Sequence, residues 1–303
     1  KRITICPRPI IAATLFEKQV KRGHKMTNNV ENKVIIVTGA GGGFGRLVCQ
    51  KASALGARLI CADINASTLN ETVDAIKSNG GIATAVQTDV TDLKRMKTLA
   101  AHAVETHGSI DVMINNAGVM PLSFFSDHEA AADAWSRCID INIKGVLHGI
   151  TAVYDQMMAQ GRGHVINLSS IYGNFPVVGA AVYGATKTAV NFLSESLRVE
   201  AQGKIKVTII KPTGVPATGL GSGVVNGEAV VGILGQNAPS YLGTLMELAE
   251  GKVDPKLLDP DQPGYAALDP SYIADAIITA IDQPWGVSFG DITVRATGDG
   301  YIL

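Results

Sequence analysis

Five glycines follow directly after an apolar run, and this stretch constrains the fold most. The run 34–37 leads into Thr38-Gly-Ala-Gly-Gly-Gly-Phe-Gly45, and a segment with helical spacing follows over 46–55. Glycines let backbone N–H groups approach a phosphate, and the N-terminus of the next helix favours an anion. This predicts a dinucleotide site, and the alternative is a glycine-rich turn without a ligand. A P-loop is excluded because no Lys-Ser or Lys-Thr follows the glycines. The residues expected to contact the dinucleotide here are Gly39, Gly43, Phe44 and Gly45.

Short apolar runs alternate with helix-length segments along the rest of the chain. Most runs are continuous, which is typical of strands covered on both faces. Gly56 and Gly80 stand where the intervening helices should end. Such alternation implies parallel strands with right-handed crossovers. We therefore predict an α/β fold, a single Rossmann-type doubly wound domain whose seven-stranded parallel sheet has helices on both faces. The predicted strands are 34–37, 59–62, 82–86, 112–114, 165–168, 207–210 and 292–294.

Composition limits the classes of partner. Of the 303 residues, 46% are hydrophobic and 17% are charged, which allows a large core. The formal net charge of −1 gives little support to a nucleic-acid partner, and no apolar run reaches the ~18 residues of a membrane helix. The four cysteines form no CxxC pair and the six histidines are scattered, so we expect reduced thiols in a cytoplasmic protein and no metal site.

The first 25 residues differ from the rest of the chain. They are basic and lead to Met26, after which an ordinary domain start follows. We expect residues 1–25 to lie outside the core, either as a weak targeting arm or, the reading we favour, as a non-native extension. Residues 26–303 are then expected to form a single domain that contains the dinucleotide site.

Asp63 follows the second predicted strand, 20 residues after Gly43. A carboxylate at this place accepts hydrogen bonds from the adenosine ribose hydroxyls and repels a 2′-phosphate. No Lys or Arg lies within 39–45 or 61–69 to bind such a phosphate, so the sequence favours NAD over NADP. The neighbouring Ile64 is counted among the expected cofactor contacts. The alternative for Asp63 is a turn residue at the end of a strand.

The sequence resembles the short-chain dehydrogenase/reductase family over residues 33–215, and more loosely on to 294. Each of its motifs is weak alone, but all of them occur in the family's order. The resemblance implies that Asp89 and Val90 contact adenine and that Asn116 lies beside the cofactor. It also implies a catalytic tetrad of Asn142, Ser170, Tyr183 and Lys187. The motifs that carry the resemblance are Thr38–Gly45 (TGxxxGxG), Asp89-Val90, Asn115-Asn116-Ala117-Gly118, Asn142 in Asn-Ile-Lys-Gly, Ser170, and Tyr183-Gly-Ala-Thr-Lys187 (YxxxK).

The tetrad implies a hydride-transfer reaction. Tyr183 and Lys187 are four residues apart and share one helix face. A free tyrosine has a pKa of about 10, and a nearby ammonium with the positive nicotinamide ring stabilises phenolate, so we expect a lowered pKa for Tyr183. Tyr183 then takes the alcohol proton as hydride leaves, and returns it in the reverse direction. By resemblance, Ser170 holds the substrate oxygen, and spacing alone selects it over Ser169. Asn142 is implied to position a water that links Lys187 to solvent.

The sequence departs from the family pattern in two places. The usual Pro-Gly after the sixth strand is Pro212-Thr213, with Gly214 one place later. Val215 therefore falls where the family's backbone meets the nicotinamide carboxamide. The tail lacks the family's frequent closing Asp-Gly-Gly. Instead, 289–295 resembles the last strand of members that act on small hydroxy acids and related alcohols.

Three segments are expected to wall the substrate pocket, namely 119–125, 171–178 and 213–246. Glu228 is their only formally charged residue, so no Arg or Lys is present to clamp a carboxylate. An apolar or aromatic secondary alcohol, or the matching ketone, is the favoured substrate. Because 213–264 is long and glycine-rich, we expect a mobile lid over cofactor and substrate. The alternative to a substrate pocket is that these apolar residues only pack against the core. The alternative to a mobile lid is a permanently docked subdomain that stabilises the fold.

Other functions remain as alternatives. An NADP-dependent ketoreductase or a hydroxy-acid dehydrogenase of the same family is the nearest. A catalytically silent NAD(H)-binding regulator is more remote because all four tetrad positions are present. A nucleotide-sugar epimerase would need TGxxGxxG spacing and a larger substrate domain. Relatives commonly form homodimers or homotetramers through the YxxxK helix and its neighbour, although the face formed by Ala185, Ala189, Leu193 and Leu197 suits core packing equally well.

Overall fold

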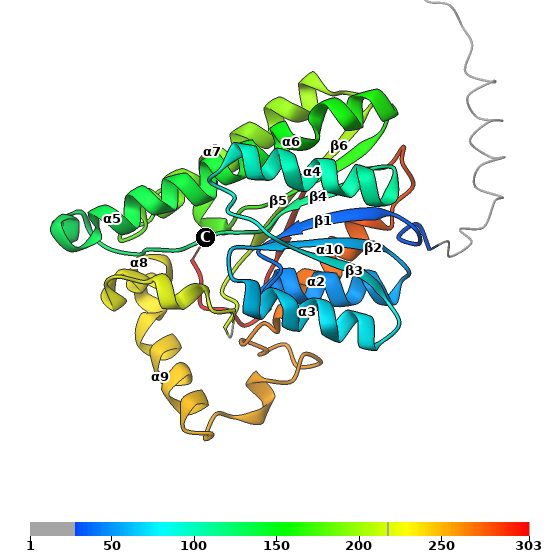
Figure 1. The fold of residues 1–303 in the computed structure, drawn as a ribbon. Helices are drawn as coiled ribbons and strands as arrows, with labels where there is room; N and C mark the ends of the chain where they lie inside the picture. The colour runs from blue at the N-terminus through cyan, green and yellow to red at the C-terminus, as the bar shows by residue number, and fades with distance from the viewer. Residues whose placement is uncertain (1–27, 217, 303) are drawn as a thin grey trace, which may run out of the picture.

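A seven-stranded sheet forms the centre of the molecule, in the order β3-β2-β1-β4-β5-β6-β7 (Figure 1). The computed structural model describes residues 28–302 except 217, so the predicted extension 1–25 lies outside the described residues. Every neighbouring pair of strands is parallel, as predicted. The strands are β1 (Val34–Thr38), β2 (Arg58–Asp63), β3 (Ile82–Gln87), β4 (Val112–Asn115), β5 (Gly163–Leu168), β6 (Ile205–Pro212) and β7 (Asp291–Val294).

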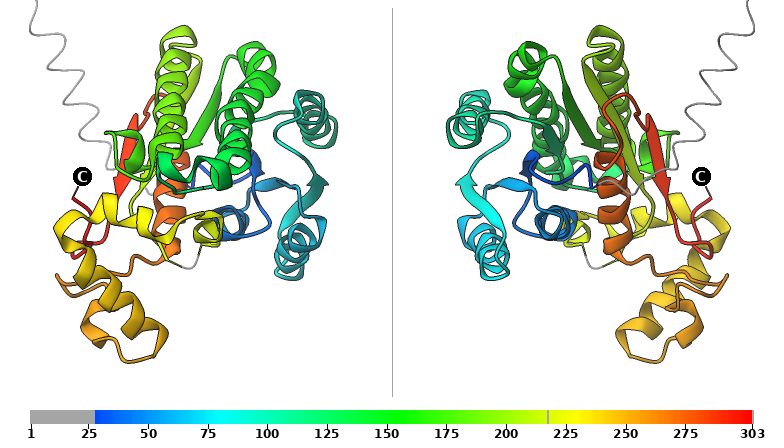
Figure 2. Two further views of the ribbon diagram at one scale, coloured as in Figure 1. Left: turned by 90° about the vertical axis from the view of Figure 1, so that its left-hand side faces the viewer. Right: turned by 90° about the vertical axis from the view of Figure 1, so that its right-hand side faces the viewer.

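Helices cover both faces of this sheet (Figures 1 and 2). Helices α2, α3 and α10 pack on one face, in a core that includes Ile35 and Val37 of β1. Helices α4, α6 and α7 pack on the other face, where Val34 and Ile36 point. The apolar runs are continuous because successive β1 side chains enter two separate cores. The helices are α2 (Gly43–Ala54), α3 (Ala66–Ser78), α4 (Leu93–His107), α5 (His128–Ile139), α6 (Gly145–Gln160), α7 (Ala181–Glu200), α8 (Val231–Leu234), α9 (Ala238–Ala249) and α10 (Pro270–Ile281).

Helix ends follow the local sequence signals. Asn65 caps α3 and Asp92 caps α4, each accepting bonds from two backbone N–H groups of the first turn. The expected stop signals are confirmed, since Gly56 and Gly80 adopt φ of +84° and +79° just beyond α2 and α3. The predicted start of α2 at residue 46 is wrong. The helix begins at Gly43 because the last two glycines of the loop form its first turn.

The buried face of α7 differs from the predicted one. Ala185 is exposed, and Ala189 and Leu193 are only partly buried. Apolar spacing selected the wrong stripe because this helix turns polar side chains inward toward the neighbouring strands. The buried residues of α7 are Tyr183, Thr186, Lys187, Val190, Ser194 and Leu197.

The segment 213–264 is partly helical and contains α8 and α9. These two helices lie beside the carboxyl ends of the strands, and α9 projects from the body of the molecule (Figures 1 and 2). Only Ala238 of α9 is buried. In the described part of the chain, no helix is both long and apolar enough to cross a membrane.

Candidate active site

The site is built where the strand order reverses. From β1 the chain continues to β2 and β3 on one side, and β4 pairs with β1 on the other. Ligands of open α/β sheets bind at the carboxyl ends of strands beside such a switch point. The ends of β1, β4, β5 and β6 therefore bring together the glycine loop and the segments that follow residues 115, 168 and 212.

The glycine loop has the form that a dinucleotide pyrophosphate requires. A Cβ at Gly45 would lie 2.1 Å from the Gly39 oxygen, so the loop closes this tightly only with glycine. Around Gly42, nothing lies within 4 Å of the Cβ position. Gly42 is also the N-cap of α2 and provides no side-chain cap, so no capping side chain accepts from the first N–H groups of α2. The residues present fit the phosphate groups of NAD or NADP.

Two polar side chains brace this loop. The Asn116 amide donates from Nδ2 to the oxygens of Thr38 (2.8 Å) and Gly39 (3.1 Å). The Thr38 hydroxyl in turn accepts from the Asn116 backbone N–H at 3.0 Å. The side chain of Asn116 thus acts on the loop that would hold the cofactor.

Asp63 lies against the same loop. Its Oδ2 accepts from the Gly41 N–H and its Oδ1 accepts from the Asn65 N–H, both at 2.9 Å. Arg46 was not predicted from the sequence, because it follows directly after the stretch 39–45 that contains no Lys or Arg. The Arg46 guanidinium donates to the Gly41 oxygen at 2.6 Å and forms a 3.0 Å ion pair with Glu71. The Arg46 guanidinium, which lies near Asp63, is therefore already hydrogen bonded and ion-paired within the protein.

The other cofactor contacts predicted near Asp63 lie just beyond the ends of β2 and β3. Ile64 is 58% exposed, and Val90 is buried with its oxygen 2.9 Å from Nδ1 of His148. The Asp89 carboxylate accepts from the backbone N–H (2.9 Å) and the hydroxyl (2.7 Å) of Thr91. These positions line one edge beside Asp63, because β2 and β3 pair in register at their ends.

Ser170 and Tyr183 meet at the end of β5. The Ser170 hydroxyl lies close enough to that of Tyr183 to favour its ionised form. Ser169 has another use, since its Oγ donates to the Lys187 main-chain oxygen at 3.2 Å. The spacing argument therefore selected the serine that faces Tyr183. The ring of Tyr172 packs edge-on against that of Tyr183, with centroids 5.5 Å apart.

Lys187 and Asn142 complete the cluster. The Lys187 ammonium donates to the Leu168 oxygen at 2.8 Å and lies 5.7 Å from the Tyr183 ring centroid. A Cβ at Gly118 would lie 3.3 Å from Oδ1 of Asn142 and 3.7 Å from Nζ of Lys187, so both side chains converge on this glycine. The structure thus brings together all four residues of the predicted tetrad.

Asn142 lies in a π-helical turn, Asp140–Lys144, between α5 and α6. Its Oδ1 accepts from the Val119 N–H at 3.0 Å. Its Nδ2 donates to the Val119 oxygen at 2.9 Å and to the Thr186 hydroxyl at 3.1 Å. The Asn142 side chain is therefore hydrogen bonded within the protein, and its expected role in positioning a water stays a prediction. Sequence reasoning missed Thr186, although it lies inside YxxxK.

Burial dominates the electrostatics of the tetrad. It lowers the pKa of Lys187 to about 8. It also raises the pKa of Tyr183, and the Ser170 hydroxyl offsets only part of this. In the protein alone the pKa of Tyr183 is therefore raised, mainly by loss of hydration; the expected lowering, which also involves the positive nicotinamide ring, stays a prediction for the complex. The Tyr183 phenol is held in its protonated form.

The segment after β6 folds back over the glycine loop. The Thr218 oxygen lies 3.0 Å from the Cβ position of Gly43, a contact that sequence reasoning missed. Val215 is partly buried against the core, and its oxygen accepts from the Thr218 hydroxyl at 3.4 Å. Beyond it, 229–234 packs with the segments 119–124 and 171–180 in one apolar cluster around Tyr183. The three predicted wall segments therefore do meet beside the tetrad.

Comparison with known proteins agrees with this geometry. A sequence model described as short chain dehydrogenase matches residues 33–228. An uncharacterised oxidoreductase of Listeria monocytogenes is 35% identical over 271 residues, covering 88% of this chain and 98% of the relative.

Solved structures give the same result. A short-chain dehydrogenase/reductase of Burkholderia phymatum in complex with NAD has a TM-score of 0.69 and 28% identity, covering 88% of this chain and 89% of that one. The closed form of a serine dehydrogenase complexed with NADP⁺ has a TM-score of 0.72 and 26% identity, covering 89% of this chain and 97% of the other. The chain belongs to the short-chain dehydrogenase/reductase family of oxidoreductases.

Proposed function

We propose that this chain is an NAD-dependent oxidoreductase that interconverts a secondary alcohol and its ketone, with Tyr183 as the general acid and base. The observation that carries the proposal is the convergence of Ser170, Tyr183, Lys187 and Asn142 beside a loop suited to pyrophosphate. A silent NAD(H)-binding regulator has no need of such a convergence.

Each residue of the tetrad has a separate role in the proposed reaction. Ser170 and Tyr183 present two hydroxyls that can hold one substrate oxygen between them. In the direction of reduction, the buried, protonated phenol of Tyr183 gives its proton to the forming alkoxide. The oxidised nicotinamide, when bound, supplies the hydride acceptor for alcohol oxidation and a positive charge that favours phenolate. Lys187 places an ammonium beside the phenol, and Asn142 holds the backbone at Val119, whose side chain packs in the apolar cluster around Tyr183.

Asp63 supports NAD as the cofactor. Its carboxylate stands at the end of β2 beside the glycine loop, where a 2′-phosphate would meet a negative charge. Arg46, which could offset that charge, is bound to Glu71 and to backbone oxygens. NADP dependence is the alternative, because the similar structures include complexes with each cofactor.

The walls around Tyr183 support an apolar or aromatic substrate of small to medium size. Leu122, Tyr172 and Ile233 pack beside Tyr183, and Val119, Met120 and Phe124 join them. The three wall segments contain no Arg or Lys, so a carboxylate would lack a partner there. A hydroxy-acid dehydrogenase is therefore the weaker alternative.

A Tyr183→Phe variant tests the mechanism. It removes the transferable proton and keeps the ring, so turnover of a secondary alcohol with NAD⁺ should fall by at least about 10²-fold. NADH binding, followed by its fluorescence, should largely persist. Tyr154→Phe, on α6 and remote from the tetrad, is the matched control. Near-normal turnover by Tyr183→Phe would show that the proposed mechanism is wrong.

We also propose that the protein is a homodimer or homotetramer. Phe192 and Val199 of α7 are each 75% exposed, and Leu147 of the neighbouring α6 is 43% exposed. Apolar side chains this exposed on two adjacent helices are typical of a face that another subunit covers. This is the helix pair through which members of the resembled family associate.

A further inference from the structure

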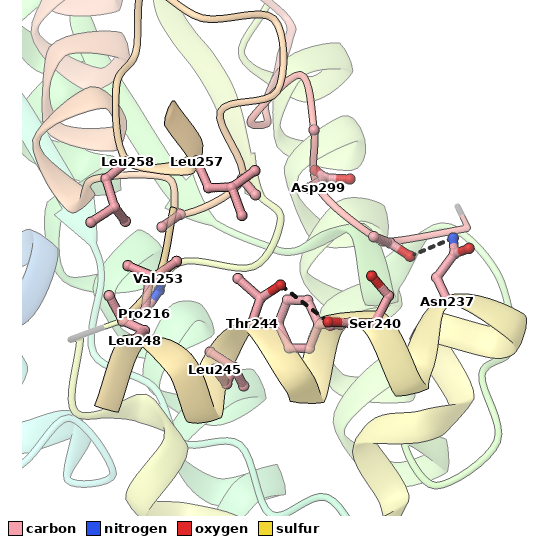
Figure 3. A pocket seen from close by; sticks show the side chains of 15 residues that line it. Pro216, Asn237, Ser240, Thr244, Leu245, Leu248, Val253, Leu257, Leu258 and Asp299 are labelled. Atoms are coloured by element: carbon pink, nitrogen blue, oxygen red, sulfur yellow. Dashed lines mark hydrogen bonds between the residues drawn. The ribbon is translucent and has the colours of Figure 1, made fainter. Parts of the chain in front are cut away.

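A cavity of about 350 Å³ lies outside the catalytic cluster, between α9, the turn at 253–258 and the tail at 298–300 (Figure 3). No tetrad residue lines it. Its walls combine apolar and polar groups, with Leu245, Leu248 and Leu257 beside the hydroxyls of Ser240 and Thr244. Its volume falls within the range of small-molecule pockets. A chamber of this kind next to an active site would admit the far end of a long apolar substrate if it were open toward Tyr183.

Tyr241 and Tyr301 stand between this outer cavity and the catalytic cluster. Tyr241 lines the cavity and also packs in the apolar cluster around Tyr183. Tyr301 packs in that cluster too, although it comes from the tail. The two rings meet edge to face, with centroids 5.8 Å apart and hydroxyls 3.2 Å apart. Together they form a continuous aromatic wall.

The wall closes against the backbone that follows β6. A Cβ at Gly214 would lie 2.1 Å from the Tyr301 hydroxyl oxygen, so the phenol rests directly on this glycine. Val215, the predicted neighbour of the nicotinamide carboxamide, is the next residue. Tyr301 therefore reaches the part of the chain that borders the reacting centre.

The tail is fixed on both sides of Tyr301. Before it, Arg295 and Asp299 form a 2.7 Å ion pair, and Nδ2 of Asn237 donates to the Gly300 oxygen at 3.0 Å. After it, the Ile302 N–H donates to the Ile233 oxygen at 3.1 Å. These bonds tie the tail to the segment 233–237, so the ring of Tyr301 is placed by the fold.

We propose that the Tyr241–Tyr301 wall determines substrate length, by ending the catalytic pocket short of the outer cavity and so favouring short ketones and alcohols. The inference rests on the proposed function and assigns a specificity role to a tail residue far beyond the match to the family's sequence model at 33–228. Opening the wall would join the two spaces, and burying two more methylenes of a substrate corresponds to about a tenfold gain in binding.

The test compares butan-2-one with decan-2-one as substrates for reduction by NADH and by NADPH. In Tyr301→Ala, the ratio of kcat/KM for decan-2-one to that for butan-2-one should rise at least about tenfold, mainly through a lower KM for decan-2-one. Tyr241→Ala should act in the same direction. Tyr301→Phe keeps the ring and should leave the ratio within about twofold of wild type.

The matched control is Tyr272→Ala. Tyr272 belongs to another edge-to-face pair, with Tyr265 at 6.3 Å, in the same C-terminal part of the chain. This variant should leave the ratio unchanged. A ratio unchanged in both Tyr301→Ala and Tyr241→Ala, with folding verified by thermal unfolding, overturns the specificity role. If Tyr301→Ala does not fold, Tyr301→Leu is used in its place.

A second measurement does not depend on turnover. Hydroxyl-radical footprinting with peptide mass spectrometry reports the solvent accessibility of Tyr172 and Tyr183 in the protein alone. Opening the wall should raise oxidation of both at least about threefold in Tyr301→Ala but not in Tyr272→Ala. If the oxidation of Tyr172 and Tyr183 does not rise in Tyr301→Ala, the proposal that the two tyrosines form a wall is wrong. If no ketone is reduced with either cofactor, the proposed function fails, and the footprint still decides whether the wall exists.

Discussion

His164 makes the stability of this fold depend on pH. Its side chain is buried on β5, where Nε2 lies 2.9 Å from the Thr208 hydroxyl. That hydroxyl donates to the Phe289 oxygen, so it accepts a hydrogen bond from Nε2 of His164. Burial first, and then the charges of Lys206 and Lys33, hold the pKa of His164 well below 6.5. The folded protein therefore resists protonation at this ring.

The magnitude follows from linkage. Above pH 6.5 neither state protonates His164, so the ring has no effect on the pH dependence of stability. As the pH falls below 6.5, the unfolded chain binds a proton that the folded chain excludes, and stability is lost until the folded pKa is reached. With a pKa near 6.5 for this His in the unfolded chain, the free energy of unfolding at pH 5.5 is about 1.4 kcal/mol lower than at high pH.

Denaturant unfolding at pH 7.5 and 5.5, at one protein concentration, measures this effect. His164→Gln keeps a donor for Thr208 but does not titrate, so its loss of unfolding free energy between the two pH values should be about 1.4 kcal/mol smaller than that of wild type. The exposed His128 provides the control, because His128→Gln should match wild type. Equal pH dependence in His164→Gln and wild type would refute the reasoning. If His164→Gln does not fold, an NMR titration that places the His164 pKa above 6 would refute it.

Three further predictions concern cofactor, assembly and lid. Wild type should prefer NAD(H) over NADP(H) at least about tenfold in kcat/KM, and Asp63→Asn should reduce this preference by about tenfold; equal use of both cofactors by wild type contradicts the role of Asp63. Light scattering at micromolar concentration should show a dimer or tetramer that Phe192→Glu weakens, because the charge would be buried at the interface; a wild-type monomer contradicts this. Hydrogen exchange over 218–228 should slow when NADH and a substrate analogue bind, because Thr218 lies over Gly43; equal, strong protection in both states rules out a mobile lid.

The fold could be predicted from the sequence because its signals are local and repeated. Each strand appears as a continuous apolar run, since residues such as Ile35 and Ile36 enter two separate cores. The glycines that end α2 and α3 need positive φ, which few other residues adopt. The inward face of α7 could not be predicted in this way, because it carries Thr186, Lys187 and Ser194, whose polar groups are satisfied by other parts of the chain.

The tetrad could be predicted because its members stand at fixed places in ordered motifs. Its electrostatics could not, since the pKa of Tyr183 depends on how much protein surrounds the phenol. Arg46 was missed for a different reason. Its guanidinium reaches back to the Gly41 oxygen from inside α2, and only the folded helix brings it beside Asp63.

Gly214 shows how a departure from a motif can have a distant cause. In the sequence, Pro212-Thr213-Gly214 is only a glycine displaced by one place. In the structure the hydroxyl of Tyr301, 87 residues later, occupies the space that a side chain at 214 would need. The glycine and the tyrosine therefore depend on each other, and bonds of Arg295, Asp299 and Asn237 help to hold the tail that carries Tyr301. No local pattern contains this relation, since it arises when the end of the chain returns to the carboxyl edge of the sheet. Because of this contact, a side chain at 214 would displace the ring of Tyr301 and so disturb the aromatic wall.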